Sequence, residues 1–167
     1  MLQLLLGNII ALIASILMVI SSSLKDRKKI IYVQTIQILF YTISDLILGG
    51  YTGAIINAIS LVRNILSYKE KLTTPWKATI IILSVLLSLY FNNLGFLGLL
   101  PIISTVTFTL FMNVKSTIKL KLLIIFTMVL WLIYDIAIKS YTSAAFDFFS
   151  AIANIVTLIQ IKVKNRY

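Results

Sequence analysis

The sequence contains no cysteine and no histidine. These absences exclude disulfides, thiolate nucleophiles, the usual general base and the common zinc sites. Acidic side chains are also scarce, and the five that occur are too dispersed to suggest a carboxylate metal cluster. We therefore expect no enzyme activity, no catalytic residues, no bound metal and no cofactor.

Charge of either sign is rare, because only 12% of the 167 residues are charged whereas 60% are hydrophobic. A soluble domain has roughly 25% charged and 45–50% apolar residues. The composition indicates an integral membrane protein, whose length allows at most about seven or eight spans of about 20 residues each. The net charge of +10 does not indicate a nucleic-acid partner, because the basic residues flank apolar segments.

Apolar runs between charged residues predict seven transmembrane helices over 2–23, 30–49, 52–68, 78–92, 94–113, 121–138 and 141–161. With the N-terminus outside, 13 of the 15 cations lie in inner segments: Lys25, Arg27, Lys28, Lys29, Lys69, Lys71, Lys77, Lys115, Lys119, Lys121, Lys162, Lys164 and Arg166. Cytoplasmic loops carry such an excess. The many Ile, Lys and Asn residues fit an AT-rich bacterial genome. We predict a multi-pass protein of the bacterial cytoplasmic (inner) membrane, with its N-terminus outside and its C-terminus in the cytoplasm.

The sequence matches itself without gaps at an offset of 90 residues. Most identical pairs are polar, which chance apolar similarity does not explain: Asp45/Asp135, Tyr51/Tyr141, Thr52/Thr142, Ser60/Ser150 and Asn64/Asn154. The match predicts a three-helix repeat over 1–69, an inner loop and connector helix over 70–93, and a second three-helix repeat over 94–167. Since three spans and one connector make an even number, the repeats are parallel, and transporters of this kind bind substrate at the repeat interface.

Polar side chains form a stripe on one face of the third span and again on the seventh. The stripes consist of Asn57, Ser60, Asn64 and Ser67, and of Asp147, Ser150, Asn154 and Thr157. For the hydroxyl groups we favour helix packing, whereas Asn64 and Asn154 indicate a central site lined from both repeats. Tyr41 and its equivalent Trp131 lie at mid-depth, where they either pack or stack on a ring or sugar face.

Asp147 replaces Asn57 of the first half, so the two halves differ in charge where a pocket would open. We interpret Asp147 as a group that reads a cationic or hydroxyl-rich substrate or carries a proton. The alternative is an ion pair with Arg63, which lies near the inner end of its span and is expected to snorkel to the surface. Asp45 and Asp135, about one turn from the outer surface, are expected to bond the following loop or cap the next helix.

The predicted arrangement resembles the SWEET and PQ-loop superfamily, which includes the PnuC-type vitamin-precursor transporters. The segments 7–11 (GNIIA), 50–54 (GYTGA) and 56–64 (INAISLVRN) resemble more closely the YgjV family of bacterial inner membrane proteins. The resemblance implies an all-α membrane protein with a SWEET-like 3+1+3 fold, in which two parallel three-helix bundles are joined by a connector helix. It also implies a central pocket at Asn64, Asn154, Tyr41 and Trp131, and facilitated diffusion by rocking of the two halves.

The sequence departs from those carriers in its prolines. Pro101, within the expected fifth span, permits a kink that is either a hinge or static, whereas Ala11 stands at the corresponding site of the first span. No PQ dipeptide is present.

We expect a transporter, either a facilitator or a secondary carrier, that moves a small polar metabolite such as a sugar, nucleoside or vitamin precursor by alternating access. The expected binding residues are Asn64, Asn154, Trp131, Tyr41, Asp147 and Asn57. The alternative is a non-transporting receptor or scaffold bundle that binds a partner. The internal repeat argues against a third class, the substrate-binding subunit of an energy-coupling importer. The expected partners are the lipid bilayer and a small polar solute, and the oligomeric state, a homo-oligomer included, is left open.

Overall fold

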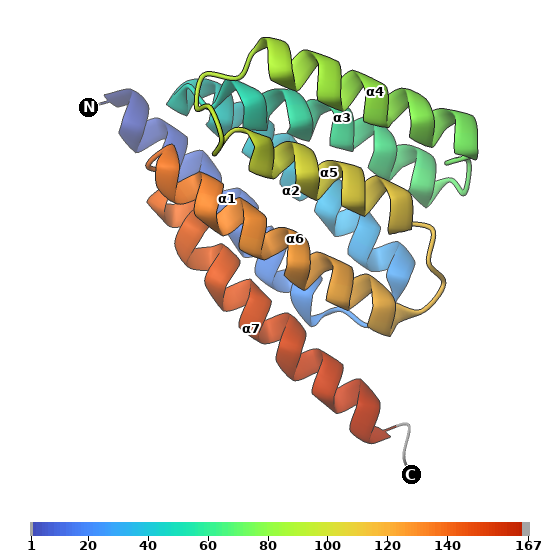
Figure 1. The fold of residues 1–167 in the computed structure, drawn as a ribbon. Coiled ribbons are helices and arrows are strands. Elements are labelled where there is room, and N and C mark those ends of the chain that lie inside the picture. The colour runs from blue at the N-terminus through green and yellow to red at the C-terminus, as the bar shows by residue number, and fades with distance from the viewer. Residues whose placement is uncertain (1, 165–167) are drawn as a thin grey trace.

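The computed structural model describes residues 2–164 as seven α-helices joined by short loops (Figure 1). The helices are α1 (Leu2–Ser23), α2 (Arg27–Leu48), α3 (Tyr51–Tyr68), α4 (Thr74–Tyr90), α5 (Leu99–Phe111), α6 (Thr117–Ala137) and α7 (Tyr141–Lys164). The expected number of helices is therefore confirmed over this range. The predicted boundaries after residues 69 and 93 both fall in loops.

The second and sixth helices begin 90 residues apart, and their ends agree with this offset to within one residue. Asp26 caps α2 by accepting a hydrogen bond from the Lys29 backbone N–H at 2.9 Å, and Ser116 caps α6 through the Lys119 N–H. At the other ends, Gly49 and Lys139 both have positive φ, of 78° and 60°. Glycine adopts this conformation without strain, whereas lysine adopts it only at a cost in conformational energy. The offset in the sequence is thus matched by backbone geometry, even where the residue type has changed.

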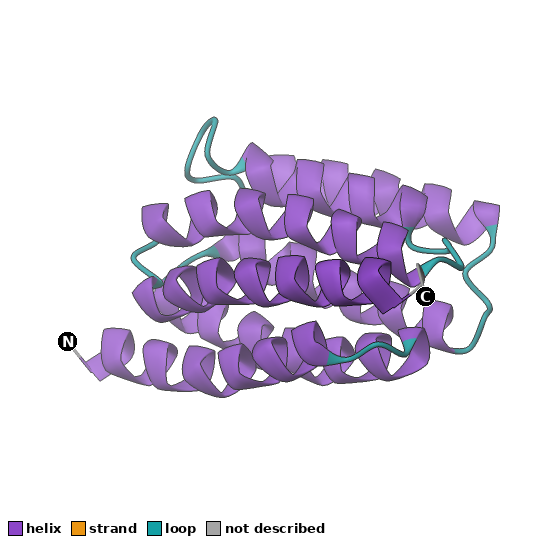
Figure 2. Cartoon of the chain, turned by 90° about the horizontal axis from the view of Figure 1, so that it is seen from below, coloured by secondary structure: helices purple, strands orange, loops and turns teal. Residues whose placement is uncertain are grey.

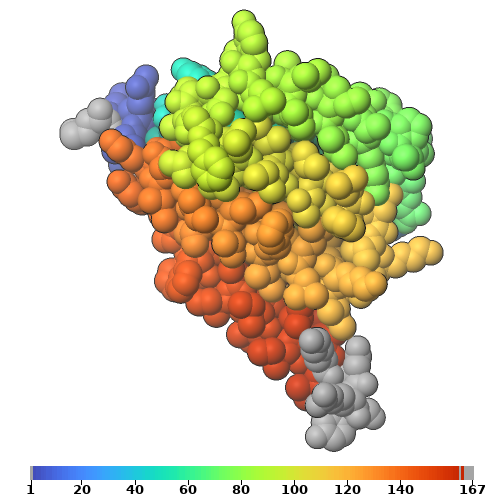
Figure 3. Space-filling view, viewed as in Figure 1, coloured from blue at the N-terminus to red at the C-terminus, as the bar shows by residue number. Residues whose placement is uncertain are grey.

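Six helices form a closed ring, and α4 lies outside it. In the ring α1 packs against α2 and α7, α3 packs against α2 and α5, and α6 packs between α5 and α7. Helix α4 packs on α3 and α5, and Figure 3 shows α4 to α7 in chain order across one face. We call α1–α3 the first half and α5–α7 the second half.

The outer surface is apolar and the interior is rich in polar groups. Large apolar side chains such as Leu5, Leu86 and Ile159 are more than half exposed, while buried polar side chains outnumber buried apolar ones among the described residues. This inversion suits a bundle surrounded by lipid, since polar groups in a membrane must face protein or water. By length and composition α1, α2, α6 and α7 are able to cross a membrane, whereas α4 and α5 are shorter apolar helices.

Helix α5 differs most from its predicted span. It begins at Leu99 rather than residue 94 and has 13 residues, so it is about 20 Å long. Pro101 consequently lies in its first turn, where the backbone nitrogen has no partner within the helix in any case. The expectation that this proline interrupts a span and permits a kink was wrong.

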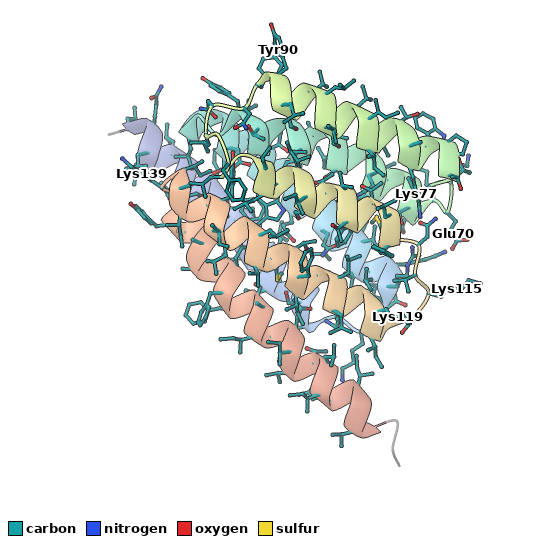
Figure 4. The ribbon with its side chains drawn as sticks, in the orientation of Figure 1. Glu70, Lys77, Tyr90, Lys115, Lys119 and Lys139 are labelled. Atoms are coloured by element: carbon teal, nitrogen blue, oxygen red, sulfur yellow. The ribbon has the colours of Figure 1, made fainter. Side chains whose placement is uncertain are left out.

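The two ends of the bundle differ in charge. Figure 4 shows Lys77, Lys115 and Lys119 at one end, with Glu70, and Lys139 at the opposite end. The α1–α2, α3–α4 and α5–α6 loops gather at the first of these, which we call the basic end (Figure 2). The other is the N-terminal end. Arg166, counted among the expected inner cations, lies outside the described residues.

Candidate functional site

A cavity of about 100 Å³ lies inside the ring. By the volume of liquid water this is room for roughly three water molecules or a small solute. It is lined by Met18, Gln34, Gln37, Ile38, Tyr41, Asp45, Asn57, Ser60, Arg63, Ser104, Thr105, Phe108, Ile124, Thr127, Met128, Trp131, Asp135 and Asp147. Both halves contribute, and only α4 among the seven helices does not.

The lining repeats at the offset of 90 residues. Helix α2 contributes positions 34, 37, 38, 41 and 45, and α6 contributes 124, 127, 128, 131 and 135. Met18 of α1 and Phe108 of α5 are also 90 residues apart. The cavity therefore lies between equivalent surfaces of the two halves.

Carboxyl groups gather toward the N-terminal end of the cavity. The Asn57 side-chain amide donates to Asp45 Oδ2 at 2.9 Å. At the equivalent positions of the second half the carboxyl groups of Asp135 and Asp147 contact each other, and Asp147 Oδ2 is buried without a hydrogen-bond partner. Two carboxylates in contact repel unless a proton or a cation compensates one of them.

The side chain of Asp45 departs from its expected role. It bonds Asn57, two turns into α3, whereas the N-cap of α3 is Gly50. The Asp45 backbone carbonyl does accept from the following loop, through the Gly50 N–H at 2.8 Å, and the Asp135 carbonyl accepts from Ser140 at 2.9 Å. Loop bonding is thus made by the backbone, which leaves both carboxyl groups in the cavity lining.

Arg63 enters the cavity from α3. It is 4% exposed, its Nε and Nη2 donate to Asn64 Oδ1 at 3.1 and 3.0 Å, and its Cζ lies 4.6 Å from the centre of the Phe108 ring. The expectation of snorkelling was wrong, because the guanidinium turns inward and stacks on this ring. Among the side chains that the structure describes, the only ion pair joins Lys28 and Glu70, so Arg63 has no carboxylate partner among them.

Four of the six expected binding residues line the cavity. Asn57 and Asp147 belong to the carboxyl end, and Tyr41 and Trp131 line it from α2 and α6. The Tyr41 hydroxyl lies 3.0 Å from Ser15 Oγ, and Trp131 packs edge-on against Tyr134.

Asn64 and Asn154 are fully buried but do not line the cavity. Asn64 accepts from Arg63, and Asn154 Oδ1 accepts from Lys121 Nζ at 3.0 Å while its amide donates to Ser22 Oγ at 2.9 Å. The two equivalent asparagines therefore each bind a buried cation, of which Arg63 lines the cavity and Lys121 does not.

Hydrogen bonds between the halves close the bundle at both ends. At the basic end Arg27 donates to the Met112 carbonyl at 3.2 Å, and Lys121 donates to the Ser22 carbonyl at 2.6 Å. The acceptors Met112 and Ser22 are 90 residues apart and therefore equivalent, whereas the donors are not, because Arg27 corresponds to Thr117 and Lys121 to Ile31. At the N-terminal end the Gly53 N–H donates to the Tyr134 hydroxyl at 2.9 Å.

Sequence reasoning missed several of these residues. The sequence places Lys121 among the cations of the inner segments, yet it is fully buried, and Arg63, Asp45 and Asp135 line the cavity. A signal was available for Arg63, because the offset pairs it with Ala153. Because the charge of Arg63 is present in one repeat only, it is not required for the helix packing that both repeats share.

The family comparison agrees with the apolar exterior of the bundle. The family model Imp-YgjV, bacterial inner membrane protein, matches residues 5–165. Comparison with curated proteins gave no match, and comparison with solved structures gave none. The family match covers nearly all of the chain, so its lipid environment is the bacterial inner membrane. The chain belongs to the YgjV family of bacterial inner membrane proteins.

Proposed function

We propose that this protein transports a small polar solute across the inner membrane by alternating access, with the solute bound in the cavity between the two halves. One observation carries the proposal: polar and charged side chains from equivalent positions of both halves line a single cavity at the centre of the ring. Polar groups are costly inside a membrane and mark solute or ion pathways. A bundle that served only as a scaffold would have little use for such a lining.

The contacts between the halves supply the two gates that alternating access requires. The Arg27–Met112 and Lys121–Ser22 hydrogen bonds close the basic end, which we place on the cytoplasmic side. The Gly53–Tyr134 bond closes the N-terminal end. Each contact joins one half to the other, so a rocking motion would break one set while it keeps the other. The proposed mechanism treats this two-half arrangement as the SWEET-like 3+1+3 scheme that the sequence predicts.

The test is solute flux in proteoliposomes. Purified protein is reconstituted and assayed for counterflow of labelled amino acids, sugars, nucleosides and vitamin precursors, with empty liposomes as the baseline. Ser60 lines the cavity from α3, whereas Val62 on the same helix is 49% exposed on the outer face. Ser60→Phe should therefore abolish flux, and Val62→Phe should keep it.

Flux that persists in the Ser60→Phe variant would place the pathway outside this cavity. If no solute class moves through the wild-type protein, the transport proposal fails. The receptor or scaffold alternative would then be pursued through native-membrane pull-down.

A further inference from the structure

The charges in the cavity are not arranged symmetrically, although most of the positions that line it fall in pairs 90 residues apart. At the offset of 90 residues Arg63 corresponds to Ala153, and Asn57 corresponds to Asp147. Among the described residues, the first half thus contributes the one cationic group in the lining, and the second half contributes the additional carboxyl group. Every other charged position in the lining, Asp45 and Asp135, is shared by the two halves.

Neither of the two unshared charges is compensated by an opposite charge within the described chain. Arg63 is held by Asn64 and Phe108, both of which are neutral. Asp147 keeps a buried oxygen without a partner beside the carboxyl group of Asp135. A buried charge without a counter-charge is unfavourable. A ligand that carries the opposite charges therefore gains binding free energy from pairing with groups that the protein itself leaves unpaired.

We propose that the cavity binds a small amphoteric solute, an amino acid with one ammonium and one carboxylate group. Its carboxylate pairs with Arg63 of the first half, and its ammonium pairs with Asp147 and Asp135 of the second half. This inference rests on the proposed function and names the solute class of the same cavity. The planar guanidinium suits a carboxylate because it offers two parallel N–H donors, and an ammonium offers three donors to two facing carboxyl groups.

Other solute classes match the charges less well. A simple amine leaves Arg63 uncompensated and adds a second cation to the same cavity. A simple carboxylate is attracted to Arg63 but enters a cavity that already holds three carboxyl groups. A neutral sugar compensates neither Arg63 nor Asp147. Only the amphoteric solute joins the two halves through complementary charges.

The size of the cavity favours a short solute. Its volume of about 100 Å³ holds roughly three water molecules, and hence a solute of only a few heavy atoms. Glycine and β-alanine are of this size, whereas 5-aminopentanoate in extended form is longer.

The experiment is a thermal-shift series on the detergent-purified full chain. The amphoteric probes are glycine, β-alanine and 5-aminopentanoate, the probes with one charge are ethylamine and propionate, and the neutral probe is glucose. A ligand that binds the folded state raises the melting temperature by mass action. We expect glycine or β-alanine to stabilise the wild-type protein at concentrations at which ethylamine, propionate and glucose do not, and 5-aminopentanoate to bind more weakly.

Variants then assign the two charges. Arg63→Gln and Asp147→Asn should each weaken the binding of the short amphoteric probe by roughly 10- to 100-fold, since each removes a hydrogen bond between charged groups. Arg63→Lys should keep part of the affinity, because it retains the charge but loses the paired donors. The wild-type series is decisive by itself if a variant does not fold.

The outcomes separate this inference from the transport proposal. If ethylamine or glucose binds as well as the amphoteric probes, or if none of the amphoteric probes binds, the inference is overturned while flux of another solute class can still support transport. If an amphoteric probe binds but no flux is measured, the binding inference stands and the transport proposal fails.

Discussion

At the level of the carboxyl groups, α2 and α3 hold the Asp45 carboxyl against the Asn57 amide, whereas α6 and α7 hold the Asp135 carboxyl against that of Asp147. The first pair is complete, because an amide donates to a carboxylate. The second pair lacks a donor, and Asp147 Oδ2 is buried without a partner. The second half thus keeps the position of the pair but not its hydrogen bond, and the incomplete pair lies in the cavity lining.

The largest effect is expected from making the first half like the second. Asn57→Asp sets a second carboxyl against Asp45 and removes the 2.9 Å hydrogen bond, and an uncompensated buried charge costs about 3 kcal/mol or more. For a chain of this size we expect the melting temperature in detergent at neutral pH to fall by roughly 6–12 °C. The deficit should shrink at pH 5, because protonation removes the repulsion among Asp45, the new carboxyl and the nearby Asp135 and Asp147.

The reciprocal substitution is the matched control. Asp147→Asn supplies the donor that the second pair lacks, so it should leave the melting temperature unchanged or raise it. A fall in melting temperature as large as that of Asn57→Asp would show that the two pairs are not equivalent.

The two basic-end contacts should differ in strength because they differ in burial. Lys121 is fully buried and serves both Ser22 and Asn154, whereas Arg27 is half-buried. Lys121→Met should lower the free energy of unfolding by about 2 kcal/mol, since it leaves two buried acceptors with fewer donors. Arg27→Met should lower it less. Thermal unfolding of both variants side by side checks the order, and an equal loss would refute the asymmetry.

The corner between α2 and α3 is tighter than its equivalent between α6 and α7. A Cβ at Gly53 would lie 2.7 Å from Asp45 Oδ2 and 2.9 Å from Tyr134 Cε1, whereas the equivalent position holds Ser143. Gly53→Ala should destabilise the protein by about 1–2 kcal/mol through overpacking. Ser143→Ala, which adds no atom, should cost less, and thermal unfolding that ranks the two in the reverse order would count against the geometry.

The smallest effect is expected at the surface. Lys28 binds Glu70 at 3.0 Å and lowers the pKa of this exposed carboxyl group through their hydrogen bond and charge. Because this pKa is lowered in the folded state, the contribution of the pair to stability is present at neutral pH and is lost as the pH falls through the lowered pKa. Glu70→Gln should barely move the melting temperature at pH 7, because solvent screens exposed pairs. A clear fall in melting temperature at pH 7 would mean that this surface ion pair contributes substantially to stability.

The sequence was sufficient to predict most of the architecture. The lengths of the apolar runs and the charged residues between them located all seven helices, because the bilayer determines both. Helix α5 was the exception, since Leu94 to Gly98 are apolar enough to extend a run although they form a loop. Apolar composition alone does not fix where a helix begins.

The candidate site was harder to predict because side-chain direction is set by packing. A polar stripe placed Asn57 and Asn64 on one face of α3, yet the structure puts Asn57 in the cavity lining and Asn64 beside it. Arg63 was expected to turn toward the membrane surface, but stacking on Phe108, which is distant in sequence, holds it inside. The local sequence does not indicate such contacts between the halves. The correspondence of Arg63 with Ala153, in contrast, can be derived from the repeat.

The central claim is that the charge difference between the halves selects the solute, and the most direct measurement is a double-mutant cycle on β-alanine binding. Arg63→Ala, Asp147→Asn and the combined variant, which gives both halves the same charges at these positions, would be titrated beside the wild type. One molecule that bridges both charges predicts that the second substitution costs much less affinity once the first is present. Full affinity for β-alanine in the combined variant, with its fold intact, would contradict the account.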